Sequence, residues 1–197
     1  MTRSIADLDW PVRTERLALR PAEQGDALTV FAFRTLPEVS RWITSHATDP
    51  EAWQAGYGDR LADTLIVELD GLVIGDLMLR FEDPWSQLEV REQAAGTQVE
   101  IGYTVDPAHA GRGYATEAVR GLLRIAFEEL GVRRVIAQCF ADNVASWRLM
   151  ERVGMRREQH TKQDSLHRSG AWLDGMMYAL LADEWREQQR ADPVSRP

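Results

Sequence analysis

The sequence predicts a mixed α/β domain built around one parallel βαβ crossover. Val99 to Val105 and Arg134 to Phe140 combine β-branched and aromatic residues, which is typical of strands. Between them, apolar residues recur three and four positions apart from Ala115 to Leu130, which predicts one amphipathic helix ended by Gly131. Two strands joined by a helix form a right-handed parallel unit.

The chain before this unit predicts one strand and several helices. Arg16 to Arg20 alternates in polarity and predicts a strand that ends at Pro21. Asp26 is the expected N-cap of a helix whose inward residues are Leu28, Phe31 and Ala32. The segment from Pro37 to His46 follows, and Asp49-Pro50 then predicts the cap and first position of another helix.

A β-hairpin is predicted next. Leu65 to Leu69 and Leu72 to Phe81 are apolar runs joined by Asp70-Gly71, a strong hairpin signal. Glu82 to Gln98 is polar and weakly patterned, which predicts a long connection with little regular structure. Trp85 within it is either a packing anchor or a wall of a substrate pocket.

The C-terminal part predicts a short helix and two last strands. The helix runs from Ala145 to Val153 and is closed by Gly154. The strands run from Arg156 to Gln163 and from Met176 to Leu181, with a polar loop between them that carries His167 and Asp174. A short polar helix or turn follows from Leu180 to Gln189. We expect a single domain over residues 1–190 and a disordered tail over 191–197.

Composition excludes several classes of function. The net charge is −8, from 31 acidic and 23 basic residues, which argues against a nucleic-acid surface. No run approaches the roughly 18 apolar residues of a membrane span, and the N-terminus lacks the apolar run of a signal peptide. The four histidines are scattered without metal-ligand spacing, so no metal site is predicted. Cys139 is the one cysteine and is expected to be buried. We therefore expect a cytoplasmic protein.

Gly111-Arg112-Gly113 connects the first strand of the crossover to its helix. The first helical turn leaves N–H groups without intrahelical partners at the positive end of the helix dipole. Glycines let a ligand approach the backbone, so the amides of Gly111 to Ala115 form a candidate phosphate site. The alternative is a tight connection only. Arg112 is either a local cation for this site or a solvent-facing side chain.

The wider stretch resembles a known family. Asp106 to Ala118 reads DPAHAGRGYATEA and resembles motif A of the GCN5-related N-acetyltransferases (GNAT), most closely their RimJ/RimL-like branch. The family signature Q/R-x-x-G-x-G/A falls on Ala108 to Gly113, with Ala108 departing at the first position. Asp142 to Met155, the opening Thr14 to Pro21 and the closing Gly170 to Asp174 are also similar to family segments.

The resemblance implies a GNAT-type fold and an acetyl-CoA donor. The sheet is then twisted and mostly antiparallel, with the parallel crossover at its centre and helices on both faces. The donor's pyrophosphate would lie on the loop amides. The implied donor-binding residues are Tyr103, Thr104, Val105, Gly111, Arg112, Gly113, Tyr114, Ala115, Thr116, Asn143 and Ser146.

Acyl transfer to an amine needs a neutral amine, a polarised thioester carbonyl and a tolerated thiolate. Glu100 is the candidate general base, and its alternative is a surface glutamate on a half-exposed strand. Many family members have a tyrosine acid where this chain has Met150, which cannot donate a proton. The resemblance places Ser146 near the donor sulfur instead, and Asn143 on the pantetheine arm. Both also suit ordinary helix-start roles.

The sequence therefore predicts an N-acyltransferase that moves acetyl from acetyl-CoA directly to a primary amine in a ternary complex. The acceptor is a protein or peptide α-amine, or a small-molecule amine. Trp42, Trp85 and Glu100 are the candidate acceptor-binding residues, although tryptophans are more often core. The alternatives are a non-catalytic acyl-CoA-binding or regulatory module, and another donor such as succinyl-CoA. A homodimer is also compatible with the resemblance.

Overall fold

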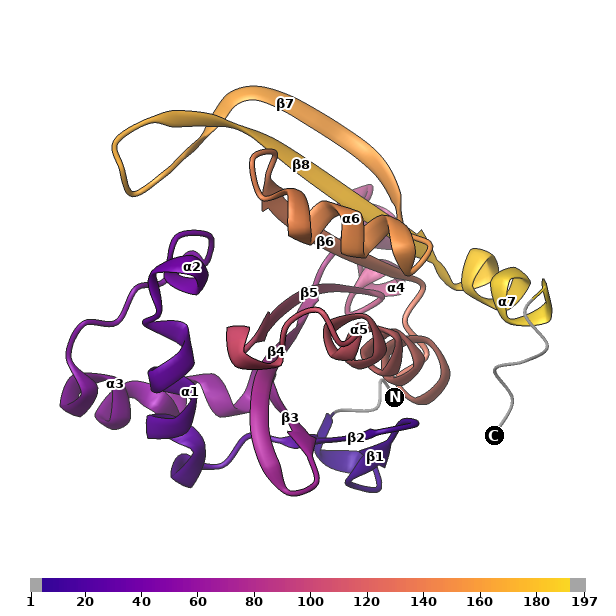
Figure 1. Ribbon diagram of the computed structural model, residues 1–197. Helices are drawn as coiled ribbons and strands as arrows, with labels where there is room; N and C mark the ends of the chain where they lie inside the picture. Colours follow the sequence, from indigo (N-terminus) through magenta and orange to yellow (C-terminus); the bar gives the residue numbers. More distant parts are fainter. Residues whose placement is uncertain (1–4, 192–197) are drawn as a thin grey trace. The chain divides into compact units, whose positions relative to one another are not determined.

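The computed structural model describes residues 5–191, which contain one sheet of eight strands in the order β1-β2-β3-β4-β5-β6-β8-β7 (Figure 1). The pair β5–β6 is parallel. The pairs β1–β2, β2–β3, β3–β4, β6–β8 and β7–β8 are antiparallel. The predicted mixed α/β fold with one parallel crossover is therefore confirmed.

The strands are β1 (Val12–Arg13), β2 (Leu17–Pro21), β3 (Thr64–Leu69), β4 (Leu72–Glu82), β5 (Gln98–Val105), β6 (Arg134–Phe140), β7 (Arg156–Leu166) and β8 (Trp172–Leu181). The α-helices are α1 (Ala27–Arg34), α2 (Pro37–Ser40), α3 (Pro50–Gly56), α4 (Arg91–Ala94), α5 (Tyr114–Arg124), α6 (Val144–Arg152) and α7 (Ala182–Ala191). Short helical turns are η1 (Ile5–Asp7), η2 (Gln24–Asp26), η3 (Tyr57–Asp63), η4 (Leu88–Val90), η5 (Pro107–His109) and η6 (Ile125–Glu129), the last a π-helical continuation of α5.

These elements divide into two compact units. The first comprises residues 5–79 and 101–122, and the second comprises residues 80–100 and 123–191. The expected single domain over 1–190 stays a prediction. The expected disordered tail lies outside the described residues from 192 onward, while Ala191 ends α7.

Helices cover both faces of the sheet within the first unit. Ile66 of β3 packs with α1, Trp53 and Tyr57 in one hydrophobic cluster. Its neighbour Val67 faces the opposite side, together with its register partner Leu19 of β2. On that side α5 lies against β2, because a Cβ built at Gly121 would be 2.8 Å from Leu19 Cδ1. The expectation of helices on both faces is met here.

The inward face of α1 differs from the expected one. Ala27, Val30 and Phe33 are buried, whereas Leu28 is 48% exposed and Ala32 is exposed. The prediction that Leu28 and Ala32 point inward is wrong. Asp26 directly precedes α1, as predicted for its N-cap, but its carboxylate makes no capping hydrogen bond to this helix and accepts instead from Arg20, at 2.8 Å to each oxygen.

Two local predictions are confirmed in the first unit. The carboxylate of Asp49 accepts hydrogen bonds from the N–H groups of Glu51 (2.9 Å) and Ala52 (3.3 Å), as an N-cap does. The turn between β3 and β4 places Asp70 at φ 53° and Gly71 at φ 79°. Positive φ at both central residues is the geometry that Asp-Gly favours in a two-residue hairpin.

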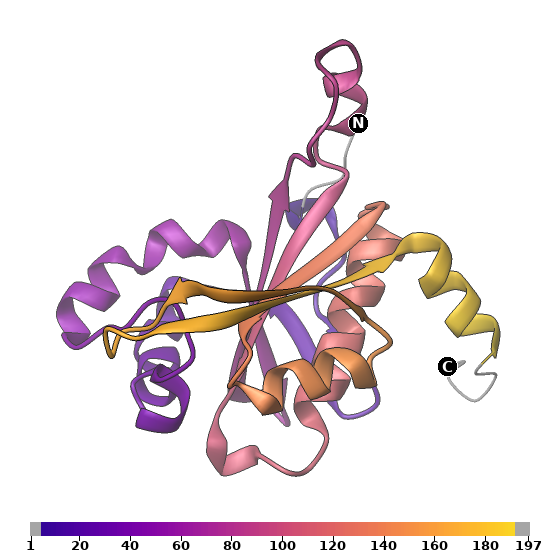
Figure 2. The same cartoon turned by 90° about the horizontal axis from the view of Figure 1, so that it is seen from above.

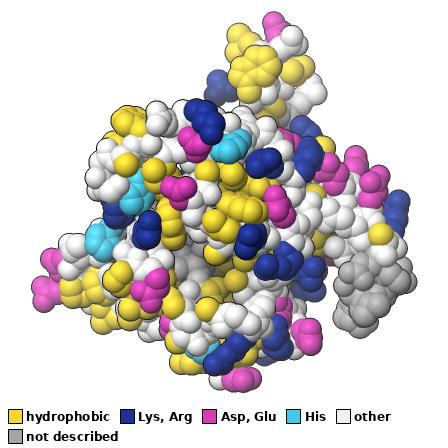
Figure 3. Space-filling view, turned by 45° about the horizontal axis from the view of Figure 1, so that its top comes forward, with side chains coloured by type: hydrophobic (Ala, Val, Ile, Leu, Met, Phe, Trp, Pro, Cys, Tyr) yellow, Lys and Arg dark blue, Asp and Glu magenta, His cyan; other side chains and the backbone are white. Residues whose placement is uncertain are grey.

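The connection between β4 and β5 is more regular than expected. It contains η4 and α4, and in Figure 2 it projects beyond the ends of the two strands. Trp85 is 94% exposed and Leu88 is 80% exposed. The hydrophobic side chains of this projecting segment are visible at the top of Figure 3. The interpretation of Trp85 as a packing anchor is therefore wrong.

The last hairpin is longer than expected. β7 and β8 extend to Leu166 and Trp172, so Asp174 lies within β8 and not in the loop. α7 begins at Ala182, because residues 180 and 181 still pair with β6. The extra length comes from cross-strand pairing, which no local pattern in these polar residues encodes.

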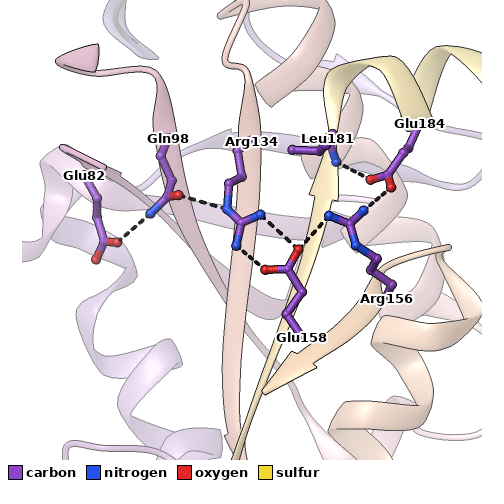
Figure 4. Close-up of polar contacts among 7 residues, drawn as sticks. All are labelled: Glu82, Gln98, Arg134, Arg156, Glu158, Leu181 and Glu184. Atoms are coloured by element: carbon purple, nitrogen blue, oxygen red, sulfur yellow. Dashed lines mark hydrogen bonds and ion pairs between the residues drawn. The ribbon is translucent and has the colours of Figure 1, made fainter. Parts of the chain in front are cut away.

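A chain of polar contacts ties the elements of the second unit together (Figure 4). Arg134 of β6 donates to Gln98 of β5 (3.0 Å) and to Glu158 of β7 (2.5 and 3.1 Å). The chain continues on one side to Glu82, and on the other through Arg156 and Glu184 to the N–H of Leu181. The two arginines hold the pKa of Glu158 below its ordinary value, Arg134 most strongly.

Candidate active site

The first unit contains the predicted loop between β5 and α5. Asp106 directly follows β5 and is the N-cap of η5. Its carboxylate accepts a hydrogen bond from the Ala108 N–H (2.9 Å). Gly111 and Gly113 have φ of 74° and 81°, which L-residues rarely adopt. Gly111 to Gly113 are exposed, and α5 begins at the next residue. The N-terminal end of α5 therefore lies directly beside a loop without side chains at its two glycines.

A segment far away in sequence, to which the sequence pattern gave no role, holds this loop. Arg16 Nη1 donates to the carbonyl of Arg112 (3.0 Å), and its guanidinium lies 4.6 Å from the ring centroid of Tyr114. Its Nε donates to Glu117 of α5 at 2.7 Å. The only signal in the sequence was the similarity of Thr14 to Pro21 to a family segment.

A buried ion pair supports the end of β5 within the same unit. Arg34 of α1 lies 2.5 Å from the carboxylate of Asp76 of β4 and 3.5 Å from the hydroxyl of Thr104. Burial raises the pKa of Asp76, and the Arg34 guanidinium opposes this shift. A Cβ at Gly75 would lie only 2.5 Å from the Thr104 carbonyl oxygen. Strand β4 therefore meets the backbone of β5 unusually closely at Thr104.

Residues 103–105, at the end of β5, point alternately to the two faces of the strand. Thr104 is buried and its side chain faces Arg34, while Tyr103 and Val105 alternate with it and are half-buried. Trp42 lies just after α2 in the same unit and is half-buried, with Arg41 over its ring at 4.6 Å. The structure thus brings Tyr103 to Val105 and the glycine loop into one continuous piece of the first unit.

Glu100 lies in the second unit, where its carboxylate is covered. Only 13% of its side chain is exposed. One carboxylate oxygen accepts from Arg80 of β4 and the other accepts from Gln138 of β6 (3.4 Å). Glu100 is therefore a half-buried, ion-paired carboxylate on a half-exposed strand. Its role as a base stays a prediction, and Arg80 is a partner that sequence reasoning did not identify.

The start of α6 carries Asn143 and Ser146, also in the second unit. The side-chain oxygen of Asn143 accepts from the Ser146 N–H at 3.3 Å, so Asn143 is a helix N-cap. The Ser146 hydroxyl is hydrogen-bonded to the thiol of Cys139 on β6. Burial raises the pKa of Cys139 to about 11, against the lowering effect of this hydrogen bond. Met150 is buried one turn further along the helix.

Residues 5–191 contain no group of three or more His, Cys, Asp and Glu side chains that could hold a metal ion. No helix in this part of the chain is both long enough and apolar enough to cross a membrane.

Comparison with known proteins identifies the family. A model of the acetyltransferase (GNAT) domain matches residues 16–156. The chain belongs to this family. This GNAT protein is 38% identical over 179 residues to YnaD, an uncharacterized N-acetyltransferase of Bacillus subtilis (strain 168), covering 88% of this chain and 98% of YnaD. It is accordingly an N-acetyltransferase, as the sequence predicted.

Solved structures agree with the fold of this N-acetyltransferase. A GNAT-family acetyltransferase from Bacillus anthracis superposes with a TM-score of 0.74 at 28% identity, covering 87% of this chain and 98% of that one. RimL, a ribosomal L7/L12 alpha-N-protein acetyltransferase in complex with coenzyme A, gives a TM-score of 0.73 at 18% identity. That match covers 87% of this chain and 97% of RimL, and at this identity it shows the fold alone.

Proposed function

We propose that this N-acetyltransferase takes its acetyl group from acetyl-CoA and transfers it directly to a primary amine in a ternary complex. The observation that carries the proposal is the loop itself, with positive φ at Gly111 and Gly113 directly before the eleven-residue helix α5. Backbone amides at a helix N-terminus fit the diphosphate of a CoA thioester. The donor would lie on Gly111, Arg112, Gly113, Tyr114, Ala115 and Thr116, with its acyl arm along Tyr103, Thr104 and Val105.

The environment of Cys139 favours direct transfer over an acyl-enzyme. A nucleophilic cysteine must be a thiolate. Burial raises the pKa of this thiol to about 11, so only about 0.01% is thiolate at pH 7. The amine itself is then the nucleophile, and it must reach the thioester in its neutral form. A lysine-like amine with pKa ~10.4 needs a base far more than an α-amine with pKa ~8.

Within this proposal Glu100 is the general base, and Asn143 and Ser146 contact the pantetheine arm and the leaving sulfur. Glu100→Gln should keep CoA binding and lose most turnover. The matched control is Glu82→Gln, since Glu82 is a second carboxylate near Arg80, at 3.8 Å. Normal turnover in Glu100→Gln would remove Glu100 from the mechanism.

The acceptor is proposed to be an α-amine of a protein or peptide, with a small-molecule amine as the second possibility. The name of a relative that is 27% identical over 187 residues, "Putative ribosomal N-acetyltransferase YdaF" of Bacillus subtilis (strain 168), supports the first class. Trp42 and Trp85 are proposed to contact the acceptor. The high exposure of Trp85 leaves its ring accessible to a large partner. The single-domain organisation over 1–190, a cytoplasmic location and a homodimer stay predictions.

The acceptor class is tested by CoA release from acetyl-CoA with a panel of amines. The panel holds N-terminal peptides, lysine peptides, polyamines, aminoglycosides and amino-acid analogues. Release confined to N-terminal peptides would support the proposal, while release with aminoglycosides alone would assign a small-molecule acceptor. If no amine in the panel causes CoA release although acetyl-CoA still binds, succinyl-CoA is the next donor to test. If succinyl-CoA also gives no turnover, the result would favour a non-catalytic acyl-CoA sensor.

The donor site is tested separately by Gly113→Val, which adds a side chain at φ 81° in the loop. The control is Gly131→Val, which places the same side chain at φ 68° at the end of the helix. Both variants carry backbone strain, so both should lose stability. Only Gly113→Val should lose the rise in melting temperature that CoA gives. Equal CoA responses in the two variants would show that the donor lies elsewhere.

A further inference from the structure

The segment Thr14–Arg16 places four donors on one carboxylate of α5. Glu117 Oε1 accepts from the Thr14 hydroxyl (2.6 Å) and from the Arg16 N–H (2.7 Å). Glu117 Oε2 accepts from Arg16 Nε (2.7 Å) and is paired with Arg16 Nη2 (2.7 Å). Burial alone raises the pKa of Glu117, but these hydrogen bonds outweigh it and leave the pKa below its ordinary value. Glu117 is therefore held as a carboxylate.

The same guanidinium lies against the donor loop. Arg16 Nη1 donates to the carbonyl of Arg112, and Nη2 would be 3.4 Å from a Cβ at Gly113. Its carbon Cζ lies 4.6 Å from the centroid of the Tyr114 ring. Arg16 thus contacts the loop and Glu117 together, although 41% of its side chain is exposed.

The position of Glu117 creates an electrostatic problem for an anionic donor. The backbone N–H of Glu117 donates to the Gly113 carbonyl (3.0 Å), so Glu117 lies in the first turn of α5. A carboxylate there stabilises the helix through its dipole but repels a diphosphate bound at the same terminus. The chain already carries a net charge of −8, so the site cannot rely on a favourable overall field.

We propose that Arg16 is a positioning residue for donor binding that cancels the charge of Glu117 beside the diphosphate of acetyl-CoA. This inference rests on the proposed donor site. The fork of Arg16 holds both Glu117 oxygens, while its bond to the Arg112 carbonyl fixes this cation next to the loop. The loop amides then face the diphosphate without a competing unpaired negative charge.

Three variants test the proposal in a double-mutant cycle. Coenzyme A affinity is measured by calorimetry for Arg16→Gln, Glu117→Gln and the double variant. Arg16→Gln exposes the carboxylate and should weaken binding about tenfold, as one unit charge within a Debye length of a diphosphate would. Glu117→Gln should bind at least as well as the unaltered protein. The double variant should recover most of the affinity that Arg16→Gln loses.

If Arg16 only held the fold, the double variant would stay as weak as Arg16→Gln. If Arg16 bound phosphate directly, the double variant would bind CoA about tenfold more weakly than Glu117→Gln. Either result would overturn the proposal. If Arg16→Gln does not fold, Arg16→Lys keeps the charge and Glu117→Gln keeps Arg16. The proposal then requires near-normal CoA affinity in both, and at least a threefold loss in either would overturn it.

A truncated donor gives an independent readout. S-acetylpantetheine lacks the diphosphate, so its steady-state KM should be the same in Arg16→Gln and in the unaltered protein. A parallel rise of this KM with that of acetyl-CoA would show a general structural effect and overturn the charge argument. Failure of the unaltered protein to bind CoA would instead refute the donor site, which separates the two claims.

Discussion

Replacing Gly75 with alanine should destabilise the protein and weaken donor binding, because the new Cβ meets backbone that cannot rotate away. It would lie 2.5 Å from the Thr104 carbonyl oxygen and 3.3 Å from Val105 Cα. Ordinary contact begins near 3.4 Å, so the strands must separate by about 0.9 Å, the difference between 3.4 and 2.5 Å. Overpacking of this kind costs about 1–3 kcal/mol.

Alanine also reduces the entropy of the unfolded chain, which offsets about 0.4–1 kcal/mol of that cost. At the middle of both ranges the net loss is about 1.3 kcal/mol, which corresponds to a fall in melting temperature of about 3–5 °C for a chain of this size. Thermal unfolding with and without CoA measures both effects. The displaced residues Thr104 and Val105 are proposed to bind the acyl arm, so the KM for acetyl-CoA should rise as well.

Gly102→Ala is the matched control on the neighbouring strand β5. Its Cβ would meet only the flexible side chain of Met78, at 3.4 and 3.6 Å. This variant should be as stable as the unaltered protein, or slightly more so. If the melting temperatures of Gly75→Ala and Gly102→Ala lie within 1 °C of each other, the close approach of β4 to Thr104 does not limit stability, and the reasoning is refuted.

Three further perturbations test the environment of particular side chains. Arg34→Ala leaves Asp76 buried without its partner and should cost about 3–5 kcal/mol. Because burial raises the pKa of Asp76, the loss in the free energy of unfolding, measured in urea, should be larger at pH 8 than at pH 5. Adding Asp76→Asn to Arg34→Ala should reduce this loss. Cys139, with its pKa raised to about 11, should react with iodoacetamide at pH 8 on the order of a hundredfold more slowly in the folded chain than in urea, as followed by mass spectrometry. Tyr178→Phe removes a hydroxyl that donates to Glu151 at 2.9 Å and should cost about 1 kcal/mol in the same unfolding assay.

Each of these three has a result that contradicts it. A pH-independent deficit in Arg34→Ala would mean that Asp76 does not carry the buried charge. Rapid labelling of folded Cys139 would mean that the thiol is accessible as a thiolate, and would reopen an acyl-enzyme route. Unchanged stability in Tyr178→Phe would mean that water satisfies Glu151 equally well.

The sequence by itself determined the parts of this protein whose causes are local. The period of the apolar residues defined α5, the Asp70-Gly71 turn defined the β3–β4 hairpin, and Asp49 capped α3. The strand, glycine loop and helix start of the proposed donor site are also adjacent in sequence. These features depend on neighbouring residues and on backbone geometry, so a pattern of a few residues is sufficient to predict them.

Only the tertiary structure decided which distant groups meet. Arg16 and Glu117 are 101 residues apart, and Arg34 and Thr104 are 70 apart, so no local pattern links them. The exposure of Leu28, the length of the last hairpin and the exposed position of Trp85 likewise depend on which surfaces find a packing partner. Ion pairs and burial are properties of the assembled chain. The glycine loop of the proposed donor site could therefore be predicted from sequence, whereas the charges that lie beside it come from the fold.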